Sequence, residues 1–225
     1  MTKLRIWTAG ILFSAFTAGP VEAQLPAAWS YGPQNSGFTG TIGVGTANGT
    51  TEVNGNFAAG GAPGSARYSS SAMTYDLFLG YAISGRWRLG AEVQFMPSGT
   101  SLNSYAYAGT TGATVYATVA AAFYPIVGVG FWVKTNVGYG EVNYRAPILV
   151  NGVPTGGGTV SMSGGGLAAG LGLGYEWRPA GGAFMIAPFA NYVSQLSSVT
   201  LSGDTQPWSC RAALLQIGVG FGYNP

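Results

Sequence analysis

The chain of 225 residues contains no histidine and a single cysteine, Cys210. Without an imidazole there is no histidine base to activate a serine or cysteine nucleophile at neutral pH, so the common catalytic triads are excluded. Zinc sites that use histidine are excluded too, and one thiol can form neither a thiolate site nor an intramolecular disulfide. The sequence therefore predicts a protein without a metal, a cofactor or an enzymatic activity.

The chain also contains few charged residues. Only 7% of the residues are charged, whereas about a quarter are charged in soluble domains. Apolar residues make up 47% of the chain and 38 residues are glycine, a composition too apolar for a disordered glycine-rich polypeptide. The formal net charge of +2 gives no basic surface for nucleic acid, so no nucleic-acid partner is expected.

The N-terminus has the layout of a secretory signal peptide. Lys3 and Arg5 precede an apolar stretch over residues 6–19, and the small residues of Val21-Glu22-Ala23 follow it. We expect cleavage after Ala23, which makes residues 1–23 a signal peptide and residues 24–225 one mature domain. A membrane anchor is the alternative, but the apolar stretch is shorter than the roughly 20 residues that a spanning helix needs.

Apolar residues alternate with small or polar ones along most of the mature chain. In the last stretch, "LLQIGVGFGYNP", residues Leu215 to Tyr223 place a large apolar side chain at every second position, with Gln216 and glycines between them. Alternation of this kind predicts β-strands with one apolar face. It recurs in eight segments of roughly ten residues, the length of a transmembrane β-strand: residues 38–45, 73–83, 87–96, 114–124, 129–140, 167–178, 184–195 and 214–223.

The connections between these segments are alternately short and long. Short turns are expected at residues 84–85, 125–126 and 179–182, and long loops rich in Gly, Ser, Thr and Asn at residues 48–71, 97–112, 145–159 and 197–210. Short turns at one end and long loops at the other are typical of outer-membrane barrels. We therefore predict an all-β fold: an eight-stranded antiparallel up-and-down transmembrane β-barrel, with its apolar face toward lipid and small side chains in a crowded lumen.

Parts of the sequence also fit two other folds. Residues 113–133 form an uncharged, mostly apolar run long enough for a membrane-spanning helix, and Gly166, Gly170 and Gly174 have the GxxxG spacing of helix packing. Pro125 and Gly128 interrupt that run, and the same glycines fit a period of two. A soluble secreted barrel is the second alternative, but its outer face should be polar.

The motifs "YDLFLGYAISGRWRLGAEV", "VGFWVKTNVGYG", "GGGLAAGLGLGYEWRP" and "LLQIGVGFGY" resemble those of the small eight-stranded outer-membrane barrels of the OmpA/OmpX and opacity-protein type. The last motif resembles the C-terminal assembly signal of that family, with Phe221 and Tyr223 as its alternating aromatic residues. The resemblance implies the outer membrane of a Gram-negative-type bacterium, with membrane lipid, lipopolysaccharide and the barrel-assembly machinery as partners. Enzymes among such barrels rely on a histidine, which is absent here.

Charged residues on the inward faces are the candidate site. Five charged residues are expected in the lumen: Asp76, Arg88, Glu92, Lys134 and Glu176. Arg88 is expected near Asp76 and Glu92. Asp76 and Glu92 on neighbouring strands have the chemistry of a general acid/base pair. The favoured interpretation is an ionic cluster that fills the lumen and neutralises its own charges.

The expected function is structural or surface-exposed: envelope stability, and adhesion or recognition of a cell-surface ligand through long loops. Tyr105, Tyr107 and Trp208 in those loops are candidate contacts. The alternative is a narrow channel for small or hydrophobic solutes, if Tyr116, Trp132 and Phe189 leave a gap beside the inward glycines. Cys210, placed in the last loop, is expected to be an inert thiol, with intermolecular pairing as the other possibility.

Overall fold

The structure is a computed structural model of the whole chain. It describes residues 29–31, 36–56, 63–99, 111–126, 128–150, 153–179, 183–201 and 208–224, and all ordered elements among them are β-strands. Within these ranges no helix has the length and apolar character needed to cross a membrane. The helical alternative for residues 113–133 is wrong, because this stretch contributes to two strands joined by a turn.

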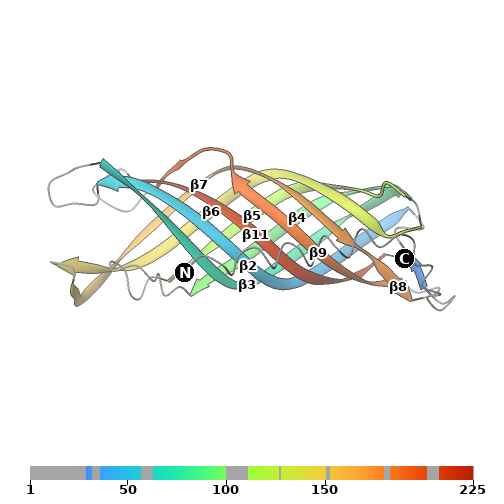
Figure 1. Cartoon of the computed structure of the whole chain (residues 1–225), viewed down its shortest axis with the longest axis horizontal. Helices are drawn as coiled ribbons and strands as arrows, with labels where there is room; N and C mark the ends of the chain where they lie inside the picture. The colour runs from blue at the N-terminus through green and yellow to red at the C-terminus, as the bar shows by residue number, and fades with distance from the viewer. Residues whose placement is uncertain are drawn as a thin grey trace, which may run out of the picture.

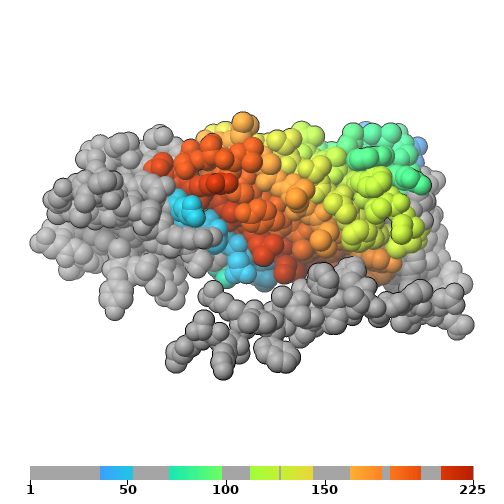
Figure 2. Space-filling view, turned by 45° about the horizontal axis from the view of Figure 1, so that its top comes forward, coloured from blue at the N-terminus to red at the C-terminus, as the bar shows by residue number. Residues whose placement is uncertain are grey.

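Eight long antiparallel strands form a closed barrel (Figure 1). In pairing order they are β2 (Gly37–Asn56), β3 (Pro63–Ser84), β4 (Trp87–Gly99), β5 (Thr111–Phe123), β6 (Phe131–Val150), β7 (Val153–Tyr175), β9 (Phe184–Gln195) and β11 (Trp208–Tyr223). The barrel closes because β11 pairs with both β9 and β2. These three strands lie side by side as a continuous surface in Figure 2. The predicted eight-stranded architecture is confirmed.

Three short strands extend the sheet at its ends. The strand β8 (Trp177–Pro179) continues β7 after Glu176 and pairs with β1 (Trp29–Tyr31). The strand β10 (Val199–Leu201) pairs with the beginning of β11. The break between β7 and β8 lies opposite Pro188 of β9, which has no N–H to donate to the ladder.

The strands are staggered around the barrel. Following the paired residues once around it from Thr39 on β2 leads back to β2 at Gly49, ten residues further along. A stagger of this kind tilts the strands against the barrel axis, as Figure 1 shows. Side chains from different depths of their strands therefore meet at one level of the lumen.

The outward surface carries a broad apolar band. Leu79, Val119, Leu171 and Ile217 are among its exposed side chains, and a band of this extent facing outward on every strand fits lipid and not water. The soluble-barrel alternative is therefore wrong. At the end with the short turns, each of the eight strands contributes one aromatic residue to a girdle: Phe38, Tyr81, Trp87, Phe123, Phe131, Tyr175, Phe184 and Tyr223.

The opposite end of the barrel carries two tall hairpins, called the arms below. The first arm consists of residues 49–56 of β2 paired with residues 63–70 of β3, and the second of residues 142–150 of β6 paired with residues 153–164 of β7. In barrel order the arms lie on opposite sides, separated by β4 and β5 on one side and by β9 and β11 on the other. Figure 1 shows them diverging from the same end.

The arms correct the predicted loops. Residues 48–71 and 145–159 are mostly strand, although they were predicted to be loops. Lipid-facing alternation stops there, but backbone pairing needs only N–H and C=O groups and continues beyond the apolar band. The predicted loops 97–112 and 197–210 are also shorter, because β4 ends at Gly99, β5 begins at Thr111, and β10 and β11 occupy part of the last one.

Candidate functional site: the lumen

Among the residues whose side chains the structure describes, six charged ones are buried inside the barrel, three acidic and three basic. They are Asp76, Arg88, Glu92, Lys134, Glu176 and Arg178. Burying an isolated charge is costly, so such groups need partners of opposite sign. The six formal charges sum to zero, and they are distributed over two clusters at different levels.

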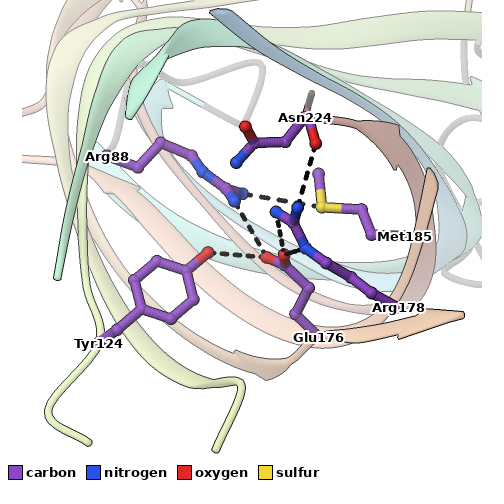
Figure 3. Close-up of polar contacts among 6 residues, drawn as sticks. All are labelled: Arg88, Tyr124, Glu176, Arg178, Met185 and Asn224. Atoms are coloured by element: carbon purple, nitrogen blue, oxygen red, sulfur yellow. Dashed lines mark hydrogen bonds and ion pairs between the residues drawn. The ribbon is translucent and has the colours of Figure 1, made fainter. Parts of the chain in front are cut away.

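The lower cluster is centred on Glu176, close to the end with the short turns (Figure 3). Arg88 Nη2 donates to Glu176 Oε2 at 3.1 Å, and Arg178 Nε donates to Glu176 Oε1 at 2.7 Å. The hydroxyl of Tyr124 donates to Glu176 Oε2 at 2.8 Å. Both carboxylate oxygens are therefore occupied by charge-assisted or hydroxyl hydrogen bonds.

The lower cluster also holds the end of the last strand. Arg178 Nη1 donates to the main-chain carbonyl of Asn224 at 3.1 Å, and the Asn224 N–H donates to the carbonyl of Ala183 at 2.7 Å. Asn224 thus turns inward and is buried after the outward Tyr223. Arg88 lies 5.4 Å from the Tyr124 ring centre, within cation–π range. These side chains fill the lumen at the turn end.

The middle cluster is centred on Glu92. Lys134 Nζ pairs with Glu92 Oε1, and Asn136 Nδ2 donates to Glu92 Oε2 at 2.9 Å. The carboxyl group of Asp76 lies beside both Glu92 and Lys134. Lys134 therefore faces two carboxylates from neighbouring strands.

The five predicted lumen residues all point inward, but they form two groups and not one. Arg88 pairs with Glu176 and not with Asp76 or Glu92. Sequence reasoning missed Arg178, whose place in the alternation two residues after Glu176 was the available signal. It also missed the neutral partners Tyr124 and Asn136, which alternation places inward without indicating their contacts.

An apolar cluster lies in the lumen above the charges. Its buried members come from six strands, so they converge from all around the barrel: Ala47, Met96, Tyr116, Ala168, Val193 and Leu214. The hydroxyl of Tyr116 donates to the carbonyl of Ala212 at 3.1 Å and so has a partner. Above the cluster, the side chain of Gln195 bonds to the backbone of two other strands. Its Nε2 donates to the carbonyl of Gly140 at 3.0 Å, and its Oε1 accepts from the Ala212 N–H at 2.9 Å.

Large inward side chains occupy the space beside inward glycines. A Cβ added at Gly43 would lie 2.9 Å from the Phe189 ring, and one at Gly174 would collide with Trp132. A cavity of about 50 Å³ lies between the two charged clusters, and its lining includes Asp76, Lys134 and Glu176. Among the described residues no three His, Cys, Asp or Glu side chains come together as a metal site.

The predicted residues outside the lumen are also placed. Phe221 and Tyr223 face outward near the turn end, and the Tyr223 ring meets the Phe184 ring edge-on at 5.5 Å. Cys210 was wrongly placed in a loop: it is a buried residue of β11, paired with Val53 of β2. Tyr105 and Tyr107 lie outside the described residues, and Trp208 begins β11 instead of lying in a loop.

No family model matches the chain, and no curated protein matches it. Among solved structures it is similar to Ail, the attachment invasion locus protein of Yersinia pestis, with a TM-score of 0.48 and 16% identity over 82% of this chain and 98% of that one. The outer membrane protein OprG from Pseudomonas aeruginosa gives a TM-score of 0.48 and 15% identity over 87% and 98% of the two chains. Neisserial surface protein A gives a TM-score of 0.46 and 11% identity over 83% of this chain and 98% of that one. At such identities, what this barrel does has to be inferred from its own residues.

Proposed function

We propose that this protein is a non-catalytic surface barrel of the bacterial outer membrane, which presents its two arms for adhesion or recognition. The observation that carries the proposal is the contrast between the ends of the molecule. The lumen is filled by the Glu176 cluster at the turn end and by the apolar cluster around Tyr116 at the other. Beyond that apolar cluster the barrel wall continues as two paired arms.

The arms suit a contact role because their backbone is ordered by pairing. The β2–β3 ladder continues to Asn56 opposite Pro63, and the β6–β7 ladder to Val150 opposite Val153. A transmembrane strand needs about ten residues, whereas β2 has 20 and β7 has 23. The excess length serves no membrane-spanning purpose, and a rigid extension loses less conformational entropy on binding than a flexible loop.

The location follows from the same features. The apolar band and the aromatic girdle fit a bilayer, and the arms would then lie on the outside, next to lipopolysaccharide. Residues 1–23 would direct export, and the barrel-assembly machinery would recognise the last strand through Phe221 and Tyr223. Mass spectrometry of the protein from an outer-membrane fraction should give a mature N-terminus at Gln24. An N-terminus at Met1 would contradict the signal peptide.

The adhesion proposal is tested with arm-shortened variants displayed on cells. Residues 53–66 are replaced by Asn-Gly, and residues 147–157 are replaced by Asn-Gly in a second variant. Binding of the cells to immobilised host extracellular matrix and sulfated polysaccharide is then compared with wild type. We expect reduced binding, while heat-dependent gel mobility shows that each barrel still folds. Unchanged binding by both shortened variants, or no binding by the wild type, would contradict the arms' proposed role.

A channel for small solutes is the second candidate. The cavity of about 50 Å³ favours it, because it shows that the lumen is incompletely filled between the two charged clusters. Our proposal expects no discrete conductance steps from the purified protein in a planar bilayer. Reproducible steps, absent with heat-denatured protein, would replace the scaffold proposal with the channel.

The non-catalytic part of the proposal rests on access as well as on the missing histidine. Glu92 and Glu176 have no exposed surface, and both are held by cationic partners. A substrate therefore has no route to either of these two carboxylates, so neither can act on it as acid or base. Incubation of the purified barrel with phospholipid and lipopolysaccharide should leave both unchanged by mass spectrometry, and hydrolysis products would contradict this.

A further inference from the structure

The lower cluster carries an excess of positive charge. Arg88 and Arg178 share the single carboxylate of Glu176, so the three buried groups sum to one positive charge. The matching negative excess lies in the middle cluster, and among the described residues no ion pair joins the two clusters. A buried charge is stabilised best by direct contact with a group of opposite sign. The lower cluster therefore lacks one anionic partner.

Glu176 has no capacity for further donors. Its Oε1 accepts from Arg178 Nε at 2.7 Å, and Arg178 Nη2 lies at the same distance from that oxygen. Its Oε2 accepts from Arg88 Nη2 at 3.1 Å and from the Tyr124 hydroxyl at 2.8 Å. These four close donors equal the roughly four lone-pair sites of a carboxylate. Any other donor at this level needs a different acceptor.

The Arg88 guanidinium has such donors left over. Arg88 is 5% exposed, and its Nε has no hydrogen-bond partner among the described residues. Its Nη1 meets the thioether sulfur of Met185, a weak acceptor, at 4.0 Å. The cavity of about 50 Å³ borders both residues. A cavity needs roughly 10–15 Å³ to hold one water molecule, so a monatomic ion has room beside Arg88.

Two neutral side chains add further unpaired groups at the same end of the lumen. Both amide atoms of Asn224 and the hydroxyl of Thr39 have no hydrogen-bond partner among the described residues, although the side chains are only 1% and 4% exposed. Thr39 precedes Gly40 and Asn224 follows Tyr223, and the pairing of Gly40 with Tyr223 places both at the turn end of the β2–β11 ladder. In Figure 3 the amide of Asn224 points toward the Arg88 guanidinium.

The chemistry of these groups selects the ligand. Roughly nine in ten buried polar groups are hydrogen-bonded, and here guanidinium, amide and hydroxyl groups can all donate. A water molecule would accept from these donors but leave the positive charge uncompensated, and a cation would be repelled by both arginines. The carboxylates of Asp76 and Glu176 line the cavity too, which restricts an anion to the side of Arg88.

We propose that the turn end of the lumen contains a binding site for a small inorganic anion of the size of chloride. Arg88 Nε, the Asn224 amide and the Thr39 hydroxyl donate to the anion, which neutralises the lower cluster. The strands β2 and β11 are the first and last long strands of the barrel, and they pair where the barrel closes. An anion bound by residues of both strands and of β4 therefore stabilises the closed barrel.

The chloride dependence of unfolding tests the site. The urea midpoint of the wild-type barrel in detergent micelles is measured in sodium chloride and in sodium gluconate of equal ionic strength, because gluconate is too large for a buried site. A ligand that binds only the folded state raises its stability by RT ln(1 + [L]/Kd). We expect a higher midpoint in chloride, which rises with the chloride concentration. Equal midpoints in the two salts would overturn the proposal.

The chain supplies a matched pair of variants. Thr39 and Thr74 are both buried, inward threonines whose hydroxyls lack a partner, but Thr74 lies two residues before Asp76 of the middle cluster. Thr39→Val should reduce the difference between the chloride and gluconate midpoints, and Thr74→Val should keep it. Heat-dependent gel mobility confirms that each variant folds. An undiminished difference in Thr39→Val, or an equal loss in both variants, would overturn the proposal.

Bromide locates the anion directly, because it replaces chloride and scatters X-rays anomalously. Crystals of the wild-type barrel grown in sodium bromide should show an anomalous peak within hydrogen-bond distance of Arg88 Nε and the Asn224 amide. The absence of a peak at this place would overturn the proposal, even if chloride raises the urea midpoint.

Discussion

The ring of Tyr116 on β5 occupies the space that a side chain at Gly140 on β6 would need. A Cβ built at Gly140 would lie 2.5 Å from the ring. The two residues are directly paired across the strands. The ring belongs to the apolar cluster in the lumen, so the absence of a side chain at Gly140 leaves room for a member of that cluster.

Gly140→Ala should displace the Tyr116 ring and weaken its hydrogen bond to the Ala212 carbonyl. Overpacking of this kind costs about 1–3 kcal/mol of the free energy of unfolding, measurable as a lower urea midpoint. Gly40→Ala is the control, because its added Cβ would meet the end of the flexible Leu79 side chain at 3.2 Å and the Phe78 carbonyl at an ordinary contact distance of 3.8 Å. Equal midpoints for the two variants would show that the ring is not held against Gly140.

Glu176→Gln should destabilise the barrel strongly. The carboxylate neutralises two buried arginines, Arg88 and Arg178, and its removal leaves both without a counter-charge. Breaking a buried ion pair in this way costs about 3–5 kcal/mol. Glu141→Gln, at an exposed carboxylate, should change the free energy of unfolding by less than about 0.5 kcal/mol. Similar urea midpoints for both variants would refute the structural role of the lower cluster.

Val219→Arg tests the lipid-facing assignment. Val219 faces outward on β11, four residues before Tyr223 of the aromatic girdle, between its paired neighbours Val44 and Pro188. An arginine at the bilayer midplane costs about 2–4 kcal/mol, and one near an interface about 0–1 kcal/mol. Ser71→Arg, at an exposed position above the apolar band, should therefore be nearly silent in unfolding from lipid vesicles. A silent Val219→Arg would mean that this face does not meet lipid.

Cys210 should react with maleimide only after unfolding. It lies beyond the apolar band, next to the exposed Arg211, and its burial raises the pKa of the thiol to about 11. The folded state therefore holds the proton more tightly than the unfolded chain, whose thiol ionises near pH 8.5. The contribution to stability is complete below that pH and is lost as pH rises toward 11. Rapid labelling of the folded barrel at pH 8 would contradict the burial.

Part of the lumen could be predicted because alternation is a local property. Residues two apart on a strand share a face, so Asp76, Arg88, Glu92, Lys134 and Glu176 could be placed inside from their positions alone. The partner of each charge could not be predicted. Arg88 and Glu176 are 88 residues apart, and they meet only because of the stagger with which the sheet closes.

The arms were missed for a related reason. Residues 48–71 contain Thr, Ser, Asn and Gly with few large apolar side chains, so the signal that marked the other strands is absent there. Their pairing depends on the backbone of the neighbouring strand, which no pattern within the segment records.

The sequence by itself determined the class of the molecule. Eight alternating segments with almost no charge can satisfy their backbone groups in lipid only as a closed barrel. Only the tertiary structure decided which side chains meet inside the lumen. Strand register and stagger bring Tyr116 against Gly140, Arg88 and Arg178 against Glu176, and Lys134 against Glu92. Those contacts depend on how strands far apart in the chain are aligned, and a period of two carries no information about that alignment.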